Sequence, residues 1–111
     1  MYCEIQAFDV EESYFDERQP RGVILSGGPE TVTAGGTPRI PERLLKIDVP
    51  ILGICYGMQA LAEQLGGGVK SSAHREFGHA EIDLHGGSEL LRTLDPGRHG
   101  KAQVWMSHGD K

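Results

Sequence analysis

The sequence predicts an α/β fold in which helices flank a mostly parallel sheet. The continuous apolar run Gly22–Ser26 is typical of a strand buried on both faces, and Ile51–Ile54 indicates a second short buried strand. A helical pattern follows each run, and this alternation of strand and helix favours a parallel sheet with right-handed crossovers. The 16 glycines stand mostly at the ends of apolar runs, where they indicate turns.

The first element is expected to be a strand. Between Tyr2 and Phe8, the residues Cys3, Ile5 and Ala7 alternate with polar ones, and the pattern ends at the acidic stretch Asp9–Glu17. Cys3 is therefore interpreted as a core residue.

Two helices are predicted in the middle of the chain. Pro41 suits the first position of a helix that closes before Pro50. A second helix follows Cys55 and ends at the glycines 66–68, with its buried face defined by apolar spacing of i, i+3, i+4 and i+7. The apolar residues are Leu44, Leu45 and Ile47 in the first helix and Met58, Leu61, Ala62 and Leu65 in the second.

From Ala80 onward the pattern predicts an added, more antiparallel segment. Apolar and charged residues first alternate, a short helix capped by its serine covers Ser88–Leu94, and a strand covers Gln103–Met106. The aromatic residues Phe77 and Trp105 are interpreted as packing residues.

Composition and charge exclude several classes of function. The 111 residues suffice for one compact domain, and 16 acidic against 11 basic residues give a net charge of −5 without a basic cluster that would bind nucleic acid. The longest strongly apolar stretch, Val49–Cys55, is far shorter than the roughly 20 residues that span a membrane. Without a secretory signal or a disulfide framework, a cytoplasmic location is expected.

The sharpest chemical feature is the segment Gly53–Gly57, at the boundary between the second strand and its helix. It is the sulfur analogue of the strained G-x-S-x-G turn, in which a β-carbon at either glycine would collide with neighbouring backbone. The helix start after Cys55 favours the thiolate, so Cys55 is predicted to be a nucleophile. On the pattern alone, an inert buried cysteine remains the alternative.

A second glycine segment, Ser26–Pro29, ends the first of these two strands. Parallel neighbours place their carboxyl ends at one edge of a sheet, so Gly28 and Cys55 are expected to lie close together. The backbone N–H groups of Gly28 and Tyr56 would then provide two donors for an oxyanion. A plain turn is the alternative, whereas a phosphate loop lacks its Gly-Lys-Ser/Thr sequence.

These motifs resemble the class I, triad-type glutamine amidotransferases. The resemblance rests on Gly53–Gln59 preceded by Ser26–Pro29, and it runs over nearly the whole chain. Within that class, Tyr56, Arg75–Gly78 and Val104–Lys111 are similar to the glutaminase domains of GMP synthetases. The resemblance implies a class I glutamine amidotransferase-like, or flavodoxin-like, fold that is truncated at both ends.

The resemblance also implies roles for individual residues. Cys55 would be the nucleophile, and Gly28 and Tyr56 would give the oxyanion-hole amides. The implied reaction is hydrolysis of L-glutamine to glutamate and ammonia through a γ-glutamyl thioester, with the ammonia used elsewhere in the enzyme to convert xanthosine monophosphate to GMP. The residues implied to hold the amino-acid end of glutamine are Gln59, Ser107, His108, Gly109 and Asp110.

Other parts of that family are not found in residues 1–111. These include a first strand, the His-Pro-Glu element of the triad, the ATP-pyrophosphatase domain with its ATP and Mg²⁺, and the dimerisation domain that would make the full enzyme a homodimer. Without the triad base we expect negligible turnover from this partial amidotransferase domain alone. A binding or regulatory module on the same scaffold, or a related cysteine hydrolase, stays open.

The histidines outside the predicted site offer no substitute base. His74, His79, His85 and His99 lie in charged or glycine-rich surroundings and are interpreted as solvated surface side chains. The spacing of His74 and His79 does not match the metal pair of a zinc helix, so no metal site is predicted.

Overall fold

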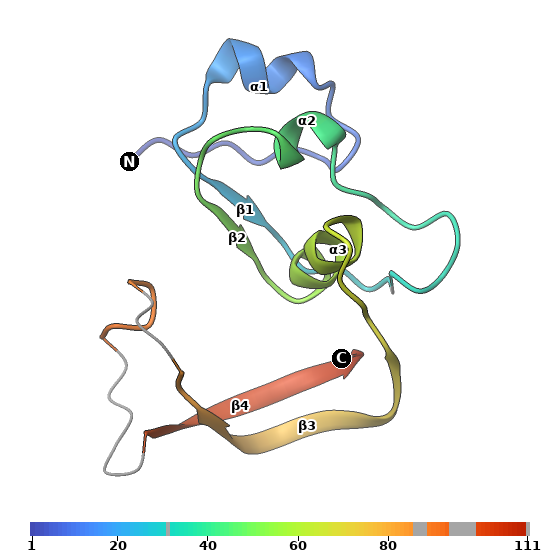
Figure 1. Ribbon diagram of the computed structural model, residues 1–111, viewed down its shortest axis with the longest axis vertical. Coiled ribbons are helices and arrows are strands. Elements are labelled where there is room, and N and C mark those ends of the chain that lie inside the picture. Colours follow the sequence, from blue (N-terminus) through green and yellow to red (C-terminus); the bar gives the residue numbers. More distant parts are fainter. Residues whose placement is uncertain (31, 86–88, 94–99, 111) are drawn as a thin grey trace. The chain divides into compact units, whose positions relative to one another are not determined.

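The computed structural model describes residues 1–30, 32–85, 89–93 and 100–110. The chain divides into two compact units, one formed by Met1–Ser71 with Asp110 and the other by Ser72–Gly109. The first unit contains the helices and a parallel strand pair, and the second contains a two-stranded sheet (Figure 1). The elements of the first unit are α1 (Ser13–Arg18), β1 (Val23–Leu25), α2 (Glu42–Leu45), β2 (Ile51–Gly53) and α3 (Tyr56–Gln64).

Strands β1 and β2 pair in parallel, as the sequence predicts. Val23 is opposite Ile51, and Leu25 is opposite Gly53. The N–H of Ile54 donates to the carbonyl oxygen of Leu25 at 2.9 Å, which extends the pairing past the last residue of β2. The carboxyl ends of both strands therefore lie at the same edge of this sheet (Figure 1).

The core of the first unit lies on one face of this strand pair. Half-buried Val23, Leu25 and Ile51 pack against it, whereas Ile24 is 67% exposed. The prediction that β1 is buried on both faces is therefore wrong: side chains alternate along a strand, and the described residues of this unit cover only one face. The buried residues are Phe15, Val32, Ile40, Leu44 and Ala60.

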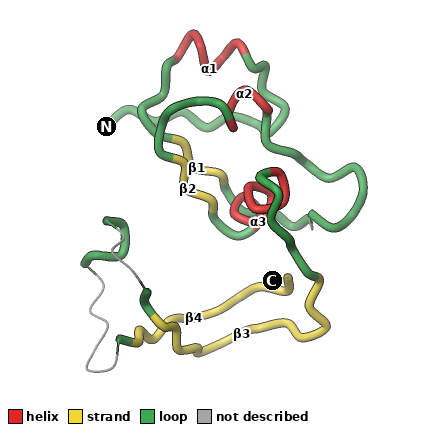
Figure 2. Tube along the Cα trace, viewed as in Figure 1, coloured by secondary structure: helices red, strands yellow, loops and turns green. Residues whose placement is uncertain are grey.

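The N-terminal segment is not the predicted strand. It runs as a loop until α1 begins inside the acidic stretch (Figure 2), and Cys3 is exposed, so the interpretation of Cys3 as a core residue is also wrong. A strand needs a neighbour to satisfy its backbone groups, and none of the described strands pairs with this segment.

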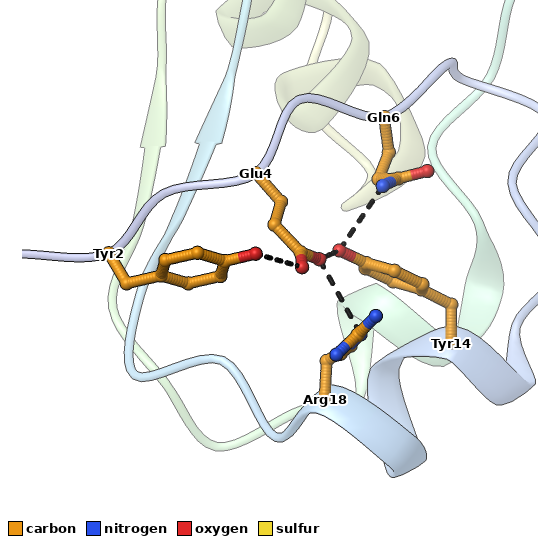
Figure 3. Close-up of polar contacts among 5 residues, drawn as sticks. All are labelled: Tyr2, Glu4, Gln6, Tyr14 and Arg18. Atoms are coloured by element: carbon orange, nitrogen blue, oxygen red, sulfur yellow. Dashed lines mark hydrogen bonds and ion pairs between the residues drawn. The ribbon is translucent and has the colours of Figure 1, made fainter.

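Side-chain bonds link this segment to α1. The Glu4 carboxylate accepts hydrogen bonds from the hydroxyls of Tyr2, at 2.7 Å, and of Tyr14 (Figure 3). Oε2 of Glu4 also lies 3.6 Å from Nε of Arg18. Gln6 donates to the Tyr14 hydroxyl at 3.3 Å. The hydrogen bond to Glu4 and the charge of Glu4 raise the pKa of Tyr2. Polar contacts with α1 thus replace the expected sheet pairing.

Helix α3 ends where the glycines predict, and Leu61 packs against the core as expected, but the rest of the buried face differs. Gly66 has a φ of 87°, and the N–H of Gly67 donates to the carbonyl of Ala62 at 2.7 Å, as in a Schellman motif. Met58 and Leu65, expected to be buried, are 55% and 66% exposed. Small residues face the core instead, Gly57 and Ala60, because the helix packs closely on the sheet.

The other predicted helices are shorter than expected or not formed. Helix α2 covers only Glu42–Leu45, and Pro41 precedes it as the N-cap residue. Residues 89–93 form turns where a helix was predicted, and the rest of that predicted helix, including Ser88, lies outside the described residues.

The second unit is built on β3 (Ser71–Asp83) and β4 (Lys101–Asp110), which run antiparallel (Figure 1). Strand β3 begins well before the predicted start at Ala80. Phe77 and Trp105 are 67% and 78% exposed, so their interpretation as packing residues is wrong for this unit.

Candidate active site

Cys55 sits at a strained turn between β2 and α3. Its backbone has a φ of 51° and a ψ of −114°, and its side chain is exposed. A residue with a side chain adopts a positive φ only when the surrounding structure enforces it. The strained nucleophile turn predicted from the sequence is therefore present in the backbone.

Both flanking glycines are required by close contacts. A Cβ at Gly53 would lie 2.7 Å from the Cα of Met58, and a Cβ at Gly57 would lie 2.2 Å from the carbonyl oxygen of Leu25. The predicted collisions are confirmed, with one refinement. Gly53 faces the turn into α3, whereas Gly57 faces the neighbouring strand β1.

The start of α3 lies directly after Cys55. The N–H of Gly57 donates to the carbonyl of Ile54 at 3.0 Å, and the N–H of Gln59 donates to the carbonyl of Cys55 at 3.1 Å. The Cys55 side chain makes no capping hydrogen bond. The partial positive charge of the helix start is therefore next to an exposed sulfur.

The segment after β1 contacts Cys55. A Cβ at Gly27 would lie 3.2 Å from the Cβ of Cys55 and 4.0 Å from its Sγ, so the predicted proximity of the two motifs is confirmed. A Cβ at Gly28 would meet no atom within 4 Å, which leaves space beside this residue. Donation by the Gly28 and Tyr56 amides to an oxyanion stays a prediction.

Helix α3 also holds the far end of the loop that begins with these glycines. The Tyr56 hydroxyl donates to the carbonyl oxygen of Pro38 at 2.5 Å. Gln64 donates from Nε2 to the carbonyl of Ile40 at 3.0 Å, and its Oε1 accepts from the Ile40 N–H at 2.7 Å. Sequence reasoning assigned Tyr56 only a backbone role and did not single out Gln64, because the pairing with Ile40 joins positions 24 apart without a local pattern.

The residues expected to hold glutamine divide between the two units. Gln59 is half-buried on α3, and Ser107 is exposed on β4. His108, Gly109 and Asp110 form the end of β4. Ser107, His108 and Gly109 belong to the second unit and Cys55 to the first, so their grouping with Cys55 stays a prediction.

The other histidines considered in the sequence are described only in part. His79 and His85 are exposed, which confirms their interpretation as surface side chains, whereas the side chain of His74 and all of His99 lie outside what is described. Among the described residues, no group of three His, Cys, Asp or Glu side chains could hold a metal ion. In that same part of the chain, no helix has the length and apolar character needed to cross a membrane.

Comparison with known proteins identifies the family. The model of the family described as glutamine amidotransferase class-I matches residues 1–111. The chain belongs to this family. The match covers both the Cys55 turn and the strand pair that positions it, as the resemblance seen in the sequence implies.

Within the class-I amidotransferases, the chain is similar to GMP synthases. The chain is 50% identical over its whole length to a glutamine-hydrolysing GMP synthase of Methylococcus capsulatus and 52% identical to one of Aeromonas salmonicida. It spans only 22% of the length of each. The crystal structure of a protein from Thermoplasma acidophilum, assigned as one subunit of GMP synthase, has a TM-score of 0.73 and 26% identity, with 97% of this chain and 52% of that one covered. The predicted fold class is thereby confirmed.

Proposed function

We propose that this chain is the glutaminase part of a GMP synthase and that Cys55 is its nucleophile. The observation that supports this most is the backbone at Cys55, held at a positive φ between β2 and α3 with Gly27 against its side chain. Inert core cysteines do not require such strain, and this one is exposed. Identity of about half to glutamine-hydrolysing GMP synthases supports the same reaction.

The reaction proceeds in two steps at the side-chain amide carbon of L-glutamine. The Cys55 thiolate adds to this carbon, and the carbonyl oxygen becomes an oxyanion that the amides of Gly28 and Tyr56 stabilise. The carbon–nitrogen bond then breaks, and the nitrogen takes up a proton and leaves as ammonia. Water attacks the resulting thioester, which releases glutamate and restores the thiolate.

Proton transfer in both steps needs a base that these residues do not provide. In the family the base is the histidine of a His-Pro-Glu element, which does not occur in the 111 residues. General acid–base catalysis contributes about 10²–10⁴-fold, so the chain by itself should hydrolyse glutamine very slowly. Gln59 and Ser107–Asp110 would hold the α-amino and α-carboxylate groups of the substrate.

The remaining steps are proposed for the whole enzyme. Ammonia would pass to an ATP-pyrophosphatase domain, which uses ATP and Mg²⁺ to adenylylate xanthosine monophosphate and so form GMP. A dimerisation domain would make the enzyme a homodimer in the cytoplasm. None of the residues described here is assigned to ATP or Mg²⁺.

The test measures glutamate formation by three proteins. They are the 111-residue chain, the chain extended with the sequences that flank the matching region in its Methylococcus capsulatus relative, and the extended chain carrying Cys55→Ser. We expect background rates from the first and third and clear activity from the second. Equal rates from the bare and extended chains would contradict the mechanism. Glutamine binding without hydrolysis in the extended chain would favour a binding module instead.

A further inference from the structure

The loop between β1 and α2, residues 26–30 and 32–41, is long and contains no helix or strand. Its start lies at the predicted oxyanion hole, since Gly27 contacts Cys55 and Gly28 follows it. Between its ends, Val32 is buried in the core. Long loops retain much conformational freedom unless contacts along their length remove it.

Helix α3 supplies such contacts at the end of this loop. The Tyr56 hydroxyl donates to the Pro38 carbonyl. The Gln64 carboxamide pairs with both backbone groups of Ile40, at 2.7 and 3.0 Å, much as a neighbouring strand would. The side chain of Ile40 is buried beside them. These three hydrogen bonds tie the loop to the helix whose first residue follows Cys55.

We propose that the Tyr56 hydroxyl and the Gln64 carboxamide are positioning residues for glutamine hydrolysis. By fixing the loop on α3, they keep the Gly28 amide in place beside Cys55, where the oxyanion forms. Tyr56 then acts twice, through its backbone N–H at the oxyanion and through its hydroxyl on the loop. This role rests on the proposed glutaminase function of the Cys55 site.

Two substitutions remove these hydrogen bonds and leave the other groups of the site in place. Tyr56→Phe removes only the hydroxyl and keeps the ring and the backbone amide. Gln64→Met keeps a side chain of similar length and removes the pairing with Ile40. Glu63→Gln, an exposed change on the same helix, is the matched control.

The measurement compares two reagents on Cys55 of the 111-residue chain and these variants. Iodoacetamide is neutral and small, so its rate reports exposure and thiolate content. The chloroketone analogue of glutamine used is 6-chloro-5-oxonorleucine, whose carbonyl stands where glutamine has its side-chain carbonyl. Cys55 Sγ forms a bond to its terminal carbon as chloride leaves, and its carbonyl oxygen occupies the place of the substrate oxyanion. Saturation kinetics with this analogue separate binding from the limiting rate of alkylation.

We expect Tyr56→Phe to lower the limiting rate with the chloroketone about three- to tenfold, the usual effect of one lost hydrogen bond. Gln64→Met loses both hydrogen bonds to Ile40 and should lower this rate at least as much. The half-saturating concentration and the iodoacetamide rate should stay within about twofold of the unsubstituted chain, as should all rates of Glu63→Gln. If Gln64→Met fails to fold, as judged by circular dichroism, Tyr56→Phe alone decides.

Two results would overturn the positioning role. One is an unchanged limiting rate in both variants; the other is an equal fall of the chloroketone and iodoacetamide rates, which would mean that the hydrogen bonds maintain the Cys55 turn as a whole. If Cys55 of the unsubstituted chain is not alkylated by the chloroketone in preference to Cys3, the proposed function itself is wrong. Failure of the two proposals is thus distinguishable.

Discussion

The two units of the chain owe their structure to different forces. In the first, five buried apolar side chains from α1, α2, α3 and the β1–α2 loop form a core against one face of a parallel strand pair. In the second, none of the described side chains is buried, and the longest strands carry exposed aromatic residues. Two-stranded sheets are marginal by themselves, whereas burial in a core stabilises substantially.

This difference gives a physical reason for the proposed nucleophile, Cys55, to lie in the first unit. A strained backbone at Cys55 persists only where surrounding contacts enforce it, and here Gly57 packs directly on Leu25 of β1. The end of β4, where glutamine-binding residues are predicted, has no comparable core among the described residues of its own unit.

The largest effect should come from the core of the first unit. Leu44 is 2% exposed, and Leu44→Ala should lower the free energy of unfolding by about 2–5 kcal/mol. Trp105→Ala in the second unit should change it by no more than about 0.5 kcal/mol, because the ring is already in solvent. Native-state hydrogen exchange of the β1 and β2 amides measures the first effect, and exchange of the β3 and β4 amides measures the second. A cost at Trp105 equal to that at Leu44 would reveal a core in the second unit.

A slightly smaller difference in stability is expected between substitutions in the two glycine segments of the site. Gly57→Ala forces a Cβ into the carbonyl of Leu25 and should cost about 2–3 kcal/mol through overpacking. Gly28→Ala meets no atom within 4 Å and should change stability by less than about 1 kcal/mol. Urea unfolding followed by circular dichroism compares them. Similar losses in both variants would argue against the close approach of α3 to β1.

The smallest effects should come from surface ion pairs, and their pH dependence differs between the units. The hydrogen bond from Arg43 lowers the pKa of Asp16 in the first unit, and the hydrogen bond to Glu81 raises the pKa of Lys101 in the second. Stabilisation by the Asp16 pair is therefore present above the ordinary aspartate pKa and is lost as pH falls through the lowered value. Stabilisation by the Lys101 pair is present below the ordinary lysine pKa and is lost as pH rises through the raised value.

The variants Asp16→Asn and Lys101→Met test this assignment. Asp16→Asn should reduce the amount of folding stability that is lost on acidification. Lys101→Met should reduce the amount that is lost at alkaline pH. Both changes should be small and should shrink in high salt, because the charged groups are exposed. Urea midpoints across pH measure them, and an alkaline effect of Asp16→Asn would refute the assignment.

Local sequence patterns predicted the parts of the fold that depend on neighbouring residues. The strand pair, the strained turn at Cys55 and the glycine end of α3 each follow from short motifs whose backbone requirements are specific. The buried face of α3 was predicted correctly at Leu61. Hydrophobicity also favoured Met58 and Leu65, whereas close packing on the sheet selected Gly57 and Ala60. Which side of a helix meets a sheet depends on tertiary contacts.

The N-terminal prediction failed for a related physical reason. Alternation at Tyr2–Phe8 describes a side-chain pattern, but a strand also needs backbone partners, and the described strands provide none for this segment. At the site, the sequence located Cys55 and its glycines but missed the side chains of Tyr56 and Gln64. Their partners are backbone groups of Pro38 and Ile40. Because these backbone groups do not depend on residue type, the sequence does not reveal such hydrogen bonds.

The most direct test of the nucleophile assignment is the relative alkylation of the two cysteines by the chloroketone analogue of glutamine. Cys3 and Cys55 are both free and exposed, so accessibility alone gives neither an advantage. Peptide-mapping mass spectrometry should show Cys55 modified well before Cys3, and L-glutamine should protect Cys55 while leaving Cys3 unaffected. Equal modification of both cysteines, without protection by glutamine, would contradict the assignment of Cys55 as the nucleophile.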